Sequence, residues 1–278
     1  MKSESRPQPS RREIDALSVC ELLRSAAAAV RDAVGNFPAS RRSARADGHS
    51  YQFELDVVAD ETASRVLLAG GVGVLSEESG RHNPERAIQV VVDPIDGSTN
   101  CSRGLDPFGP SMCALDATGP IAAVVVNIAT GDEYLAIHGV GATKNGQPLR
   151  PRTRDRLEVI VTGDPCPPLE HPIWTRVSGA SAHDLCRVAD GTFDGYFDWH
   201  NTQSVWDYLA ASLILTEAGG RIAEQRGLPL LDLDAKANRK LIAATTPAQH
   251  SKLQVLTQQR GVAVDVSRNP IRCEDDRI

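Results

Sequence analysis

The sequence predicts a mixed α/β fold, in which a strand-rich and mostly antiparallel first half is followed by alternating helices and strands. In the first half, the β-branched run IQVVV at residues 88–92 is typical of a buried strand, and the Asn145-Gly146 pair is a hairpin signal. In the second half, residues 207–218 have apolar side chains at helical spacing. An α+β part is therefore expected to be joined to an α/β part.

Local patterns predict the elements of the first half. A long amphipathic helix with an Ala-rich middle is expected from Glu13 to Gly35. Its apolar positions are Ile14, Leu17, Leu22, Leu23, Val30 and Val34. A short helix is expected over residues 60–68, and strands over residues 72–75, 88–92, 121–127, 132–137 and 157–161. The Asn-Gly turn is expected to join two strands of a hairpin.

The second half is expected to contain helices over residues 182–189, 207–218 and 247–258, with strands near Tyr196 and over residues 241–244. Gly219 and Gly220 follow the middle helix, where glycine can adopt the left-handed conformation that ends a helix. Residues 13–150 are expected to form an N-terminal α+β lobe with a candidate metal site, and residues 151–262 a C-terminal α/β lobe that completes it. Residues 1–12 are expected to be a disordered tail, and residues 263–278 a flexible one.

Composition and charge exclude several classes of protein. Of the 278 residues 41% are hydrophobic, without an apolar run of membrane-spanning length or a secretory signal, so a soluble, cytoplasmic protein is expected. The six cysteines are scattered without a CxxC pair, which predicts reduced thiols. With 30 basic and 36 acidic residues the formal net charge is −6, which argues against a nucleic-acid partner. An acidic protein can still bind a small phosphorylated molecule when metal ions supply positive charge.

The most informative stretch reads VVVDPIDGSTN. An apolar strand leads to Asp93 and Asp96, and Gly97 is followed by hydroxyl residues that can begin a helix. The two carboxylates could bind one hard cation through oxygen atoms about 2.0 to 2.6 Å away. The N–H groups of Gly97, Ser98 and Thr99 would be unpaired in the first turn and could face a phosphate. The alternative is a surface turn built from ordinary Asp-Pro and Asp-Gly turn formers.

Other acidic positions could join this pair. Glu77 and Glu78 follow the predicted strand 72–75, and two adjacent like charges are unfavourable without a cation. Asp207 stands at the start of the clearest helix, whose N-terminus directs a positive dipole toward an anion. The alternatives are solvated loop acids for Glu77 and Glu78, and a plain N-cap for Asp207.

Together these motifs resemble the inositol monophosphatase family, within a superfamily of Mg²⁺-dependent, lithium-sensitive phosphatases. The resemblance is carried by Glu77-Glu78-Ser79, by DPIDGSTN, and by Trp206-Asp207 followed by TEAGG, in the order and rough spacing of that family. The segment GVGATKNG also resembles its Gly-rich signature. Several motifs in order are more specific than any one of them. The resemblance implies a layered αβαβα sugar-phosphatase fold.

The resemblance also implies a metal centre. By similarity, Glu77, Asp93 and the carbonyl of Ile95 would hold one Mg²⁺. Asp93, Asp96 and Asp207 would hold a second, and a weaker third ion would lie near Glu77, with Mn²⁺ as an alternative ion. Metal ions about 3.5 to 4 Å apart can stabilise both the attacking and the leaving oxygen of a phosphoryl transfer, so that water serves as the nucleophile.

The catalytic residues that the resemblance implies are Asp60, Glu77 and Ser98. The hydroxyl of Ser98, paired with Asp60, would orient the attacking water, and backbone amides would neutralise the phosphate. The implied substrate-binding residues are Asp96, Gly97, Ser98, Thr99, Gly179, Ala180, Ser181, Asp198 and Asp207. Asp198 could equally be an acid of its own loop.

The sequence departs from the family pattern in three places. Val57 stands where the family has Thr in a DxVTxxD-like stretch, which puts the polar support of Asp60 and the third metal in doubt. Asp198 is two residues farther from Asp207 than the family spacing. The segment 149–175 is short and Pro-rich, so it is expected to lack the helix that the family inserts there. Its loss would reshape the pocket and the subunit contacts.

The sequence thus predicts a Mg²⁺-dependent phosphomonoester hydrolase that acts on a cyclitol, sugar or related small-metabolite phosphate, as a homodimer by similarity to the family. The alternatives within the superfamily are 3′(2′),5′-bisphosphate nucleotidase, fructose-1,6-bisphosphatase and histidinol-phosphatase. The GSTN motif is closer to the inositol and sugar group than to the nucleotidases. An alternative of another class is a non-catalytic phosphate-binding or interaction protein that has kept the fold.

Overall fold

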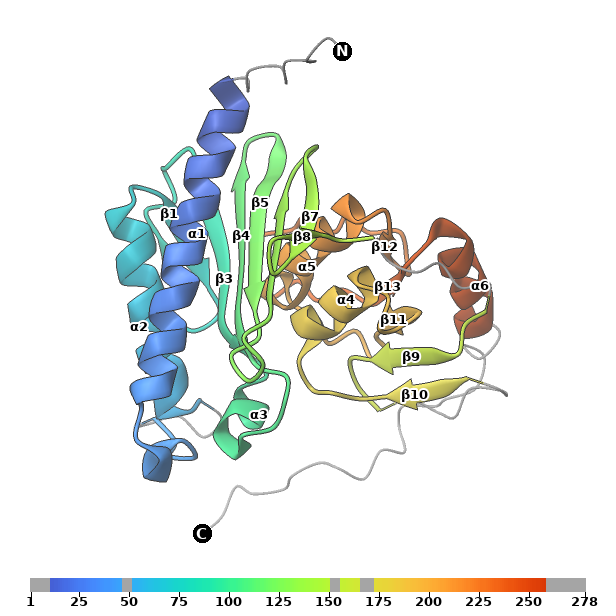
Figure 1. The fold of residues 1–278 in the computed structure, drawn as a ribbon, viewed down its shortest axis with the longest axis horizontal. Coiled ribbons are helices and arrows are strands. Elements are labelled where there is room, and N and C mark those ends of the chain that lie inside the picture. The colour runs from blue at the N-terminus through green and yellow to red at the C-terminus, as the bar shows by residue number, and fades with distance from the viewer. Residues whose placement is uncertain (1–10, 47–51, 151–155, 166–172, 259–278) are drawn as a thin grey trace, which may run out of the picture.

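The computed structural model describes residues 11–46, 52–150, 156–165 and 173–258, and its elements form five layers (Figure 1). Helices α1 (Arg11–Asn36) and α2 (Glu54–Ala69) cover one face of an eight-stranded sheet, and α4 (Ser181–Ala189) and α5 (Val205–Glu217) cover the other. A five-stranded sheet lies beyond α4 and α5, with α6 (Pro247–Gln258) on its outer face. The predicted αβαβα layering is confirmed.

The large sheet has the strand order β2-β1-β3-β4-β5-β6-β7-β8. Its strands are β1 (Gly73–Ser76), β2 (Gly80–His82), β3 (Gln89–Asp96), β4 (Gly109–Asp116), β5 (Gly119–Val126), β6 (Glu133–Ile137), β7 (Gly141–Lys144) and β8 (Gln147–Pro148). Among the strands that the structure describes in this sheet, only β1 and β3 pair in parallel, which confirms a mostly antiparallel first half. Asn145 and Gly146 have φ angles of 52° and 73°, as the predicted hairpin turn requires.

The small sheet has the order β10-β9-β11-β13-β12. Its strands are β9 (Val159–Thr162), β10 (Trp174–Arg176), β11 (Gly195–Phe197), β12 (Arg221–Glu224) and β13 (Leu241–Ala244). In the described part of the Pro-rich segment 149–175 the chain forms β9 and the start of β10, while residues 151–155 and 166–172 lie outside the described residues. The chain thus passes from the large sheet to the small one between β8 and β9. The predicted lobes 13–150 and 151–262 stay a prediction.

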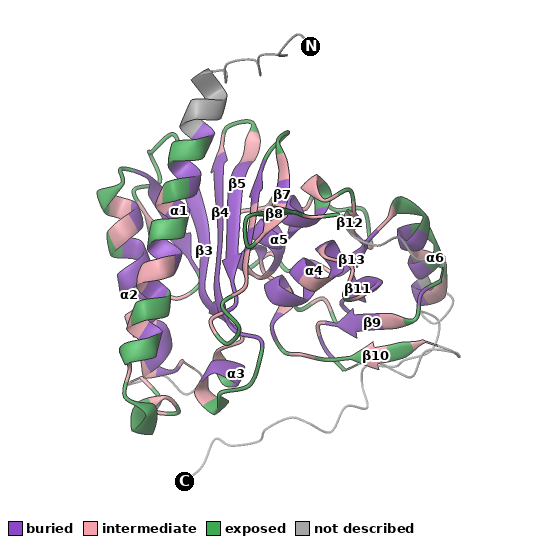
Figure 2. Ribbon diagram, viewed as in Figure 1, coloured by how far each residue is buried: buried purple, intermediate pink, exposed green. Residues whose placement is uncertain are grey.

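The helix α1 differs from its prediction at both the N-terminal boundary and the buried face. It begins at Arg11, inside the predicted tail 1–12, whose remainder lies outside the described residues, as does the tail 263–278. Leu17 was predicted to face the core but is 51% exposed. The buried series instead runs through Ala16, Val19, Leu23, Ala26, Val30 and Val34. Leu17 falls outside the helical spacing of that series, and Figure 2 shows the resulting alternation of exposed and buried turns.

Alternate residues of β3 enter two different cores. Val90 and Val92 pack toward α1 and α2, while Val91 packs toward α4 and α5. A smaller core around Ile160 and Leu253 joins the small sheet to α6. Because β3 is buried on both faces, polar side chains at its carboxyl end are held in a rigid and largely dry setting. Within the described residues, no helix has the length and apolar character needed to cross a bilayer.

Candidate active site

The acidic residues of the first half meet where β1 and β3 end side by side. The two strands are parallel neighbours, and the N–H of Glu77 donates to the carbonyl of Val92, 3.1 Å away. β3 runs on through Asp93 to Asp96, past the predicted end at residue 92, with a register shift between these two acids. In a regular strand, residues three apart face opposite sides, and the shift removes this constraint.

Backbone N–H groups orient three of the carboxylates. The N–H of Ile95 donates to Asp93 Oδ1 at 3.0 Å, and the N–H of His183 donates to Asp96 Oδ2 at 3.1 Å. Asp207 is the third residue of α5, whose N-cap is Ser204, and not the N-cap that the sequence suggested as an alternative. Its Oδ2 accepts the Ser204 N–H at 2.6 Å, which fixes the carboxylate at the helix start.

The predicted end of α5 is confirmed, because the Gly220 N–H donates to the Leu215 carbonyl at 2.9 Å.

The four carboxylates influence one another's protonation. Burial raises the pKa of Asp93 and of Asp96 well above the ordinary value, and the charges that act most strongly on Asp93 come from Glu77, Asp96 and Asp207. Desolvation of its carboxyl group, followed by the charge of Asp207, raises the pKa of Glu77 to about 8, although the residue as a whole is exposed. Burial and the charge of Asp96 raise the pKa of Asp207 to about 8.

These acids have the chemistry of a site for a hard cation. Within the described ranges, no three His, Cys, Asp or Glu side chains are gathered closely enough to enclose an ion as they stand. Even so, the strongest charges on buried Asp93 are all negative, and carboxylate oxygens are the ligands that Mg²⁺ prefers. The donor set therefore fits Mg²⁺, and binding would draw the carboxylates together.

The raised pKa values predict how stability depends on pH without metal. Because burial and the charge of Asp96 raise the pKa of Asp207 to about 8 in the folded protein, while the unfolded chain releases this proton near pH 4, stability is expected to fall as pH rises between these values. Thermal unfolding in a chelator should give a lower Tm at pH 8 than at pH 5. Added Mg²⁺ should raise Tm more at pH 8, by about 2 °C or more, because it stabilises the ionised form. An equal Mg²⁺ effect at both pH values would contradict this.

The predicted pair of Ser98 and Asp60 is not formed. Asp60 accepts a hydrogen bond from the hydroxyl of Ser76 at 2.5 Å, and the Ser98 hydroxyl donates to the Ile95 carbonyl at 3.0 Å. The acid beside Ser98 is Asp56, which is buried and whose Oδ1 has no hydrogen-bond partner among the described residues. Burial raises the pKa of Asp56, and the Phe53 N–H and the nearby Ser98 hydroxyl oppose this rise.

The start of α2 explains why Asp56, and not Asp60, lies beside Ser98. The helix begins at Glu54, six residues before the predicted start at residue 60, with Phe53 as its N-cap. The carboxylate of Asp56 accepts the Phe53 N–H at 2.9 Å, so it is fixed in the first turn. Phe53 is not one of the usual capping residues, and the sequence reading therefore missed this helix start. An acid in the position of Asp56, ahead of an apolar helical pattern, is the signal that could have found it.

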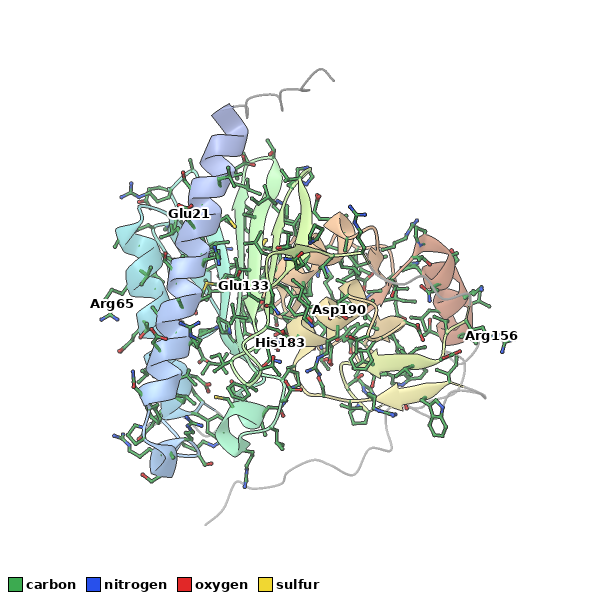
Figure 3. All side chains as sticks on the ribbon, in the orientation of Figure 1. Glu21, Arg65, Glu133, Arg156, His183 and Asp190 are labelled. Carbon is green, nitrogen blue, oxygen red and sulfur yellow. The ribbon has the colours of Figure 1, made fainter. Side chains whose placement is uncertain are left out.

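The predicted substrate segment lies against DGSTN. The side-chain amide of Asn100 donates to the carbonyls of Pro107 and Ser178, at 2.9 and 2.8 Å. Gly97 has φ +85°, and a Cβ there would lie 3.0 Å from the Cβ of Ala180. His183 lies on α4 where this helix faces the large sheet (Figure 3). Gly179, Ala180 and Ser181 are thus brought next to Asp96 and the start of α3 (Ser98–Arg103).

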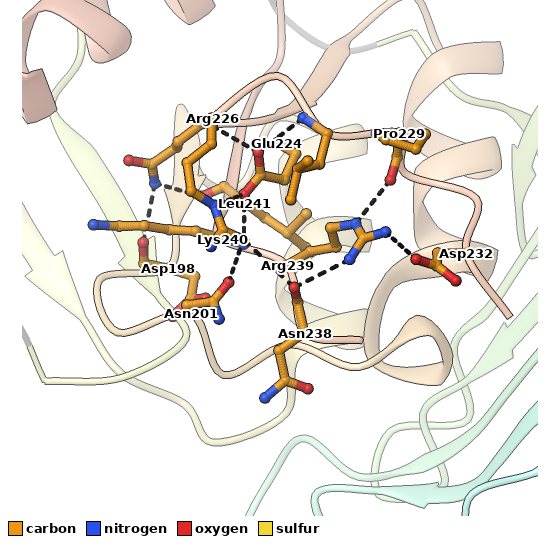
Figure 4. Close-up of polar contacts among 12 residues, drawn as sticks. Asp198, Asn201, Glu224, Arg226, Pro229, Asp232, Asn238, Arg239, Lys240 and Leu241 are labelled. Atoms are coloured by element: carbon orange, nitrogen blue, oxygen red, sulfur yellow. Dashed lines mark hydrogen bonds and ion pairs between the residues drawn. The ribbon is translucent and has the colours of Figure 1, made fainter. Parts of the chain in front are cut away.

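The carboxylate of Asp198 is hydrogen-bonded within its own loop. Its side chain is fully buried, and its two carboxylate oxygens accept the N–H groups of His200 and Thr202 at 3.2 and 2.9 Å. Its carbonyl accepts the side-chain amide of Gln225 at 3.0 Å, beside the network of Glu224, Arg226 and Asn201 (Figure 4). This favours the alternative role of Asp198, that of an acid that shapes the loop before α5.

Comparison with known proteins agrees with this arrangement. Residues 15–261 match the profile of the inositol monophosphatase family. The chain belongs to the inositol monophosphatase family. A relative from Methanothermobacter thermautotrophicus named fructose-1,6-bisphosphatase/inositol-1-monophosphatase is 30% identical, with 72% of this chain and 80% of that protein covered. A Nus factor SuhB from Xylella fastidiosa is 28% identical, with 74% and 81% covered.

Solved structures of inositol monophosphatase-fold proteins share the architecture. The crystal structure of extragenic suppressor protein suhB from Bartonella henselae has a TM-score of 0.76 to this chain at 25% identity. The match covers 88% of this chain and all of that one. As a member of the inositol monophosphatase family, the protein is a phosphatase that acts on small phosphorylated molecules.

Proposed function

We propose that this inositol monophosphatase family member is a Mg²⁺-dependent phosphomonoesterase for a cyclitol, sugar or related metabolite phosphate. The observation that carries the proposal is that Glu77, Asp96 and Asp207, which come from three separate parts of the chain, supply the strongest charges on the buried carboxylate of Asp93. When bound, Mg²⁺ would neutralise the phosphate and lower the pKa of the attacking water. We further propose two or three ions per site, with Mn²⁺ able to replace Mg²⁺.

The chain's own groups would bind the phosphate and orient the water. In α3 the first intrahelical hydrogen bond runs from the Cys101 N–H to the Gly97 carbonyl, at 2.9 Å. The N–H groups ahead of Cys101 have no acceptor within the helix, so those of Ser98 and Thr99 are available to phosphate oxygens. The Ile95 carbonyl accepts a hydrogen bond from Ser98, and a carbonyl oxygen has a second lone pair that could bind a cation. Asp56 would receive the proton or hydrogen bond of the water that Ser98 orients.

The substrate is proposed to be a compact polyol phosphate. The names of relatives support inositol and fructose phosphates as the first compounds to test. We also propose a cytoplasmic homodimer built from the two predicted lobes. Cys20, Cys101, Cys113 and Cys186 are free thiols buried in the described part of the chain, which supports a reducing compartment.

Phosphate release from a panel of phosphomonoesters tests the proposal. With Mg²⁺, hydrolysis of at least one cyclitol or sugar phosphate is expected, and a chelator should abolish it. The panel should include fructose 1,6-bisphosphate, histidinol phosphate and 3′-phosphoadenosine 5′-phosphate, which separate the alternatives within the superfamily. A folded protein that hydrolyses none of them with Mg²⁺ or Mn²⁺ would favour a binding protein, the class that the name Nus factor SuhB suggests.

A further inference from the structure

An acid and a histidine that the proposed chemistry does not use lie together beyond the ends of β9 and β11. Asp164 follows β9, and its Oδ2 contacts Nδ1 of His200, in the loop after β11. The two strands are parallel neighbours that end side by side at Thr162 and Phe197. The pair therefore stands at the carboxyl edge of the small sheet, the edge at which open α/β sheets commonly bind ligands.

The same edge borders the active site. The hydroxyl of Tyr196, on β11, donates to Ser181 Oγ of the substrate segment at 3.2 Å. Gly163, at the end of β9, packs so closely on Tyr196 that a Cβ there would lie 2.3 Å from that hydroxyl. The loop 198–204 then leads directly into α5, which carries Asp207 in its first turn. The acid and the histidine are thus next to the substrate segment, where the chain turns toward the metal site.

Asp198, the acid that could have accepted substrate hydroxyls on this side, is closed to a ligand. In addition to the two N–H groups of its loop, the hydroxyl of Thr202 donates to Asp198 Oδ1 at 3.2 Å. Asp198 is 0% exposed, so neither carboxylate oxygen reaches the surface. A hydroxyl acceptor on this side of the site must therefore come from another residue.

His200 has the properties of such an acceptor. Its side chain is 47% exposed, whereas that of Asp164 is 11% exposed. Oδ1 of Asp164 accepts the Trp199 N–H at 2.9 Å, which fixes the carboxylate behind the ring. Because a carboxylate can only accept, it takes the Nδ1–H of the neutral imidazole, and Nε2 is left with its lone pair.

The loop that carries His200 is two residues longer than the family spacing, and its neighbours hold it in place. Lys240 Nζ lies 5.2 Å from the centroid of the Trp199 ring. Asn201 has φ +64°, which asparagine tolerates better than most residues, and its Oδ1 accepts Nη2 of Arg226 at 2.7 Å (Figure 4). A contact that selects a substrate needs a support of this kind.

We propose that Nε2 of His200 accepts a hydrogen bond from a hydroxyl group of the substrate, with Asp164 as the residue that positions the ring. This specificity contact rests on the proposed function. The phosphate would lie at the start of α3, where Gly97 faces Ala180, on the other side of the substrate segment. The hydroxyl therefore belongs to the part of the substrate away from the phosphate, and the contact favours cyclitol and hexose phosphates over esters without hydroxyl groups.

Kinetics with two kinds of ester test the contact. For myo-inositol 1-phosphate and fructose 1,6-bisphosphate, H200A should raise KM roughly 3- to 10-fold, the usual effect of losing one hydrogen bond, with kcat within about twofold of native. For p-nitrophenyl phosphate, which has no hydroxyl group, neither constant should change. D164N should act like H200A. Its amide oxygen can keep the Trp199 N–H, but its NH₂ group then faces Nδ1 and places the ring proton on Nε2.

H138A is the matched control. His138 is also an exposed histidine beside an acid, with 64% of its side chain exposed and its Nδ1 3.5 Å from Glu217 Oε1. Glu217 ends α5, so His138 lies at the opposite end of that helix from Asp207. H138A should keep the native kinetic constants with every ester.

Each outcome decides one part of the proposal. An unchanged KM of H200A for both polyol phosphates, or equal losses with these and with p-nitrophenyl phosphate, would overturn the contact. Native constants in D164N would overturn the positioning role of Asp164. If the native chain hydrolyses neither polyol phosphate, the proposed function fails, and calorimetric titration with myo-inositol 1-phosphate in Mg²⁺ decides the contact separately. Weaker binding by H200A would then support it, and equal binding, or no binding by either protein, would overturn it.

Discussion

Replacing Asp93 by Asn is expected to lower kcat/KM by at least about 10³-fold, more than the loss of a single hydrogen-bond donor to a transition state. Asp93 is 2% exposed, feels the charges of both Glu77 and Asp96, and would bridge both metal ions. The Ile95 N–H now donates to Asp93 Oδ1, and the Asn amide oxygen can still accept it, so the local backbone should hold. In a chelator at pH 8 the variant should be as stable as the native protein or more stable, because one buried acid is removed.

Asp194→Asn is the matched control, because Asp194 is equally buried but structural. Asp194 is 2% exposed, and its Oδ2 accepts the N–H groups of Glu158 and Val159 at 2.8 and 2.9 Å. This variant should lower Tm while keeping kcat near native. Steady-state kinetics in saturating Mg²⁺ and thermal unfolding in a chelator measure both. If D93N kept more than about a tenth of native activity, a bridging role would be excluded.

The second large effect is expected from Asp56→Asn, which should lower kcat by roughly 10²-fold or more, the usual contribution of a group that moves or orients a proton. The amide oxygen of Asn can still accept the Phe53 N–H, so the start of α2 should be kept. Asp60→Asn is the control, since Asp60 pairs with Ser76 and not with Ser98. It should keep kcat within about threefold of native.

Ser98→Ala shows whether Ser98 acts through Asp56. It should lower kcat more than it raises KM, and the double variant with D56N should be hardly worse than either single one, because the two groups act as a unit. If D60N lost activity and D56N did not, the result would support the pairing of Ser98 with Asp60 that the family resemblance implied, and not a pairing with Asp56.

The sequence predicted individual strands and helices where their signals are local and strong, whereas the layering and the metal-holding role of the acids were implied by the family resemblance. The run IQVVV before Asp93 could only be a buried strand, and Leu209 and Leu213 set the face of α5. By contrast, β4 was not predicted. Its sequence GPSMCALD has no β-branched or aromatic residue, and it is a strand because β3 and β5 pair with it on both sides.

The features of the site that the sequence left open or missed have the same origin, since tertiary contacts decided where local preference was weak. Asp56 was overlooked because Phe53 is a poor N-cap by type, although the fold holds it in that position. For Asp198 the resemblance left a substrate contact and a loop role equally open, and the hydrogen bonds that its carboxylate accepts from two N–H groups of its own loop favour the loop role. The hydrogen bonds of Asp198 cannot be read from spacing, because they depend on the backbone conformation of its loop.

The central claim is that Glu77, Asp93, Asp96 and Asp207 hold divalent ions together. Anomalous diffraction from crystals grown with Mn²⁺ locates such ions directly. Two peaks about 3.5 to 4 Å apart are expected, with Asp93 bridging them and Asp96 and Asp207 on the ion nearer α5. The claim would be contradicted if Mn²⁺ ions bound elsewhere on the molecule and these four side chains held no metal at millimolar Mn²⁺.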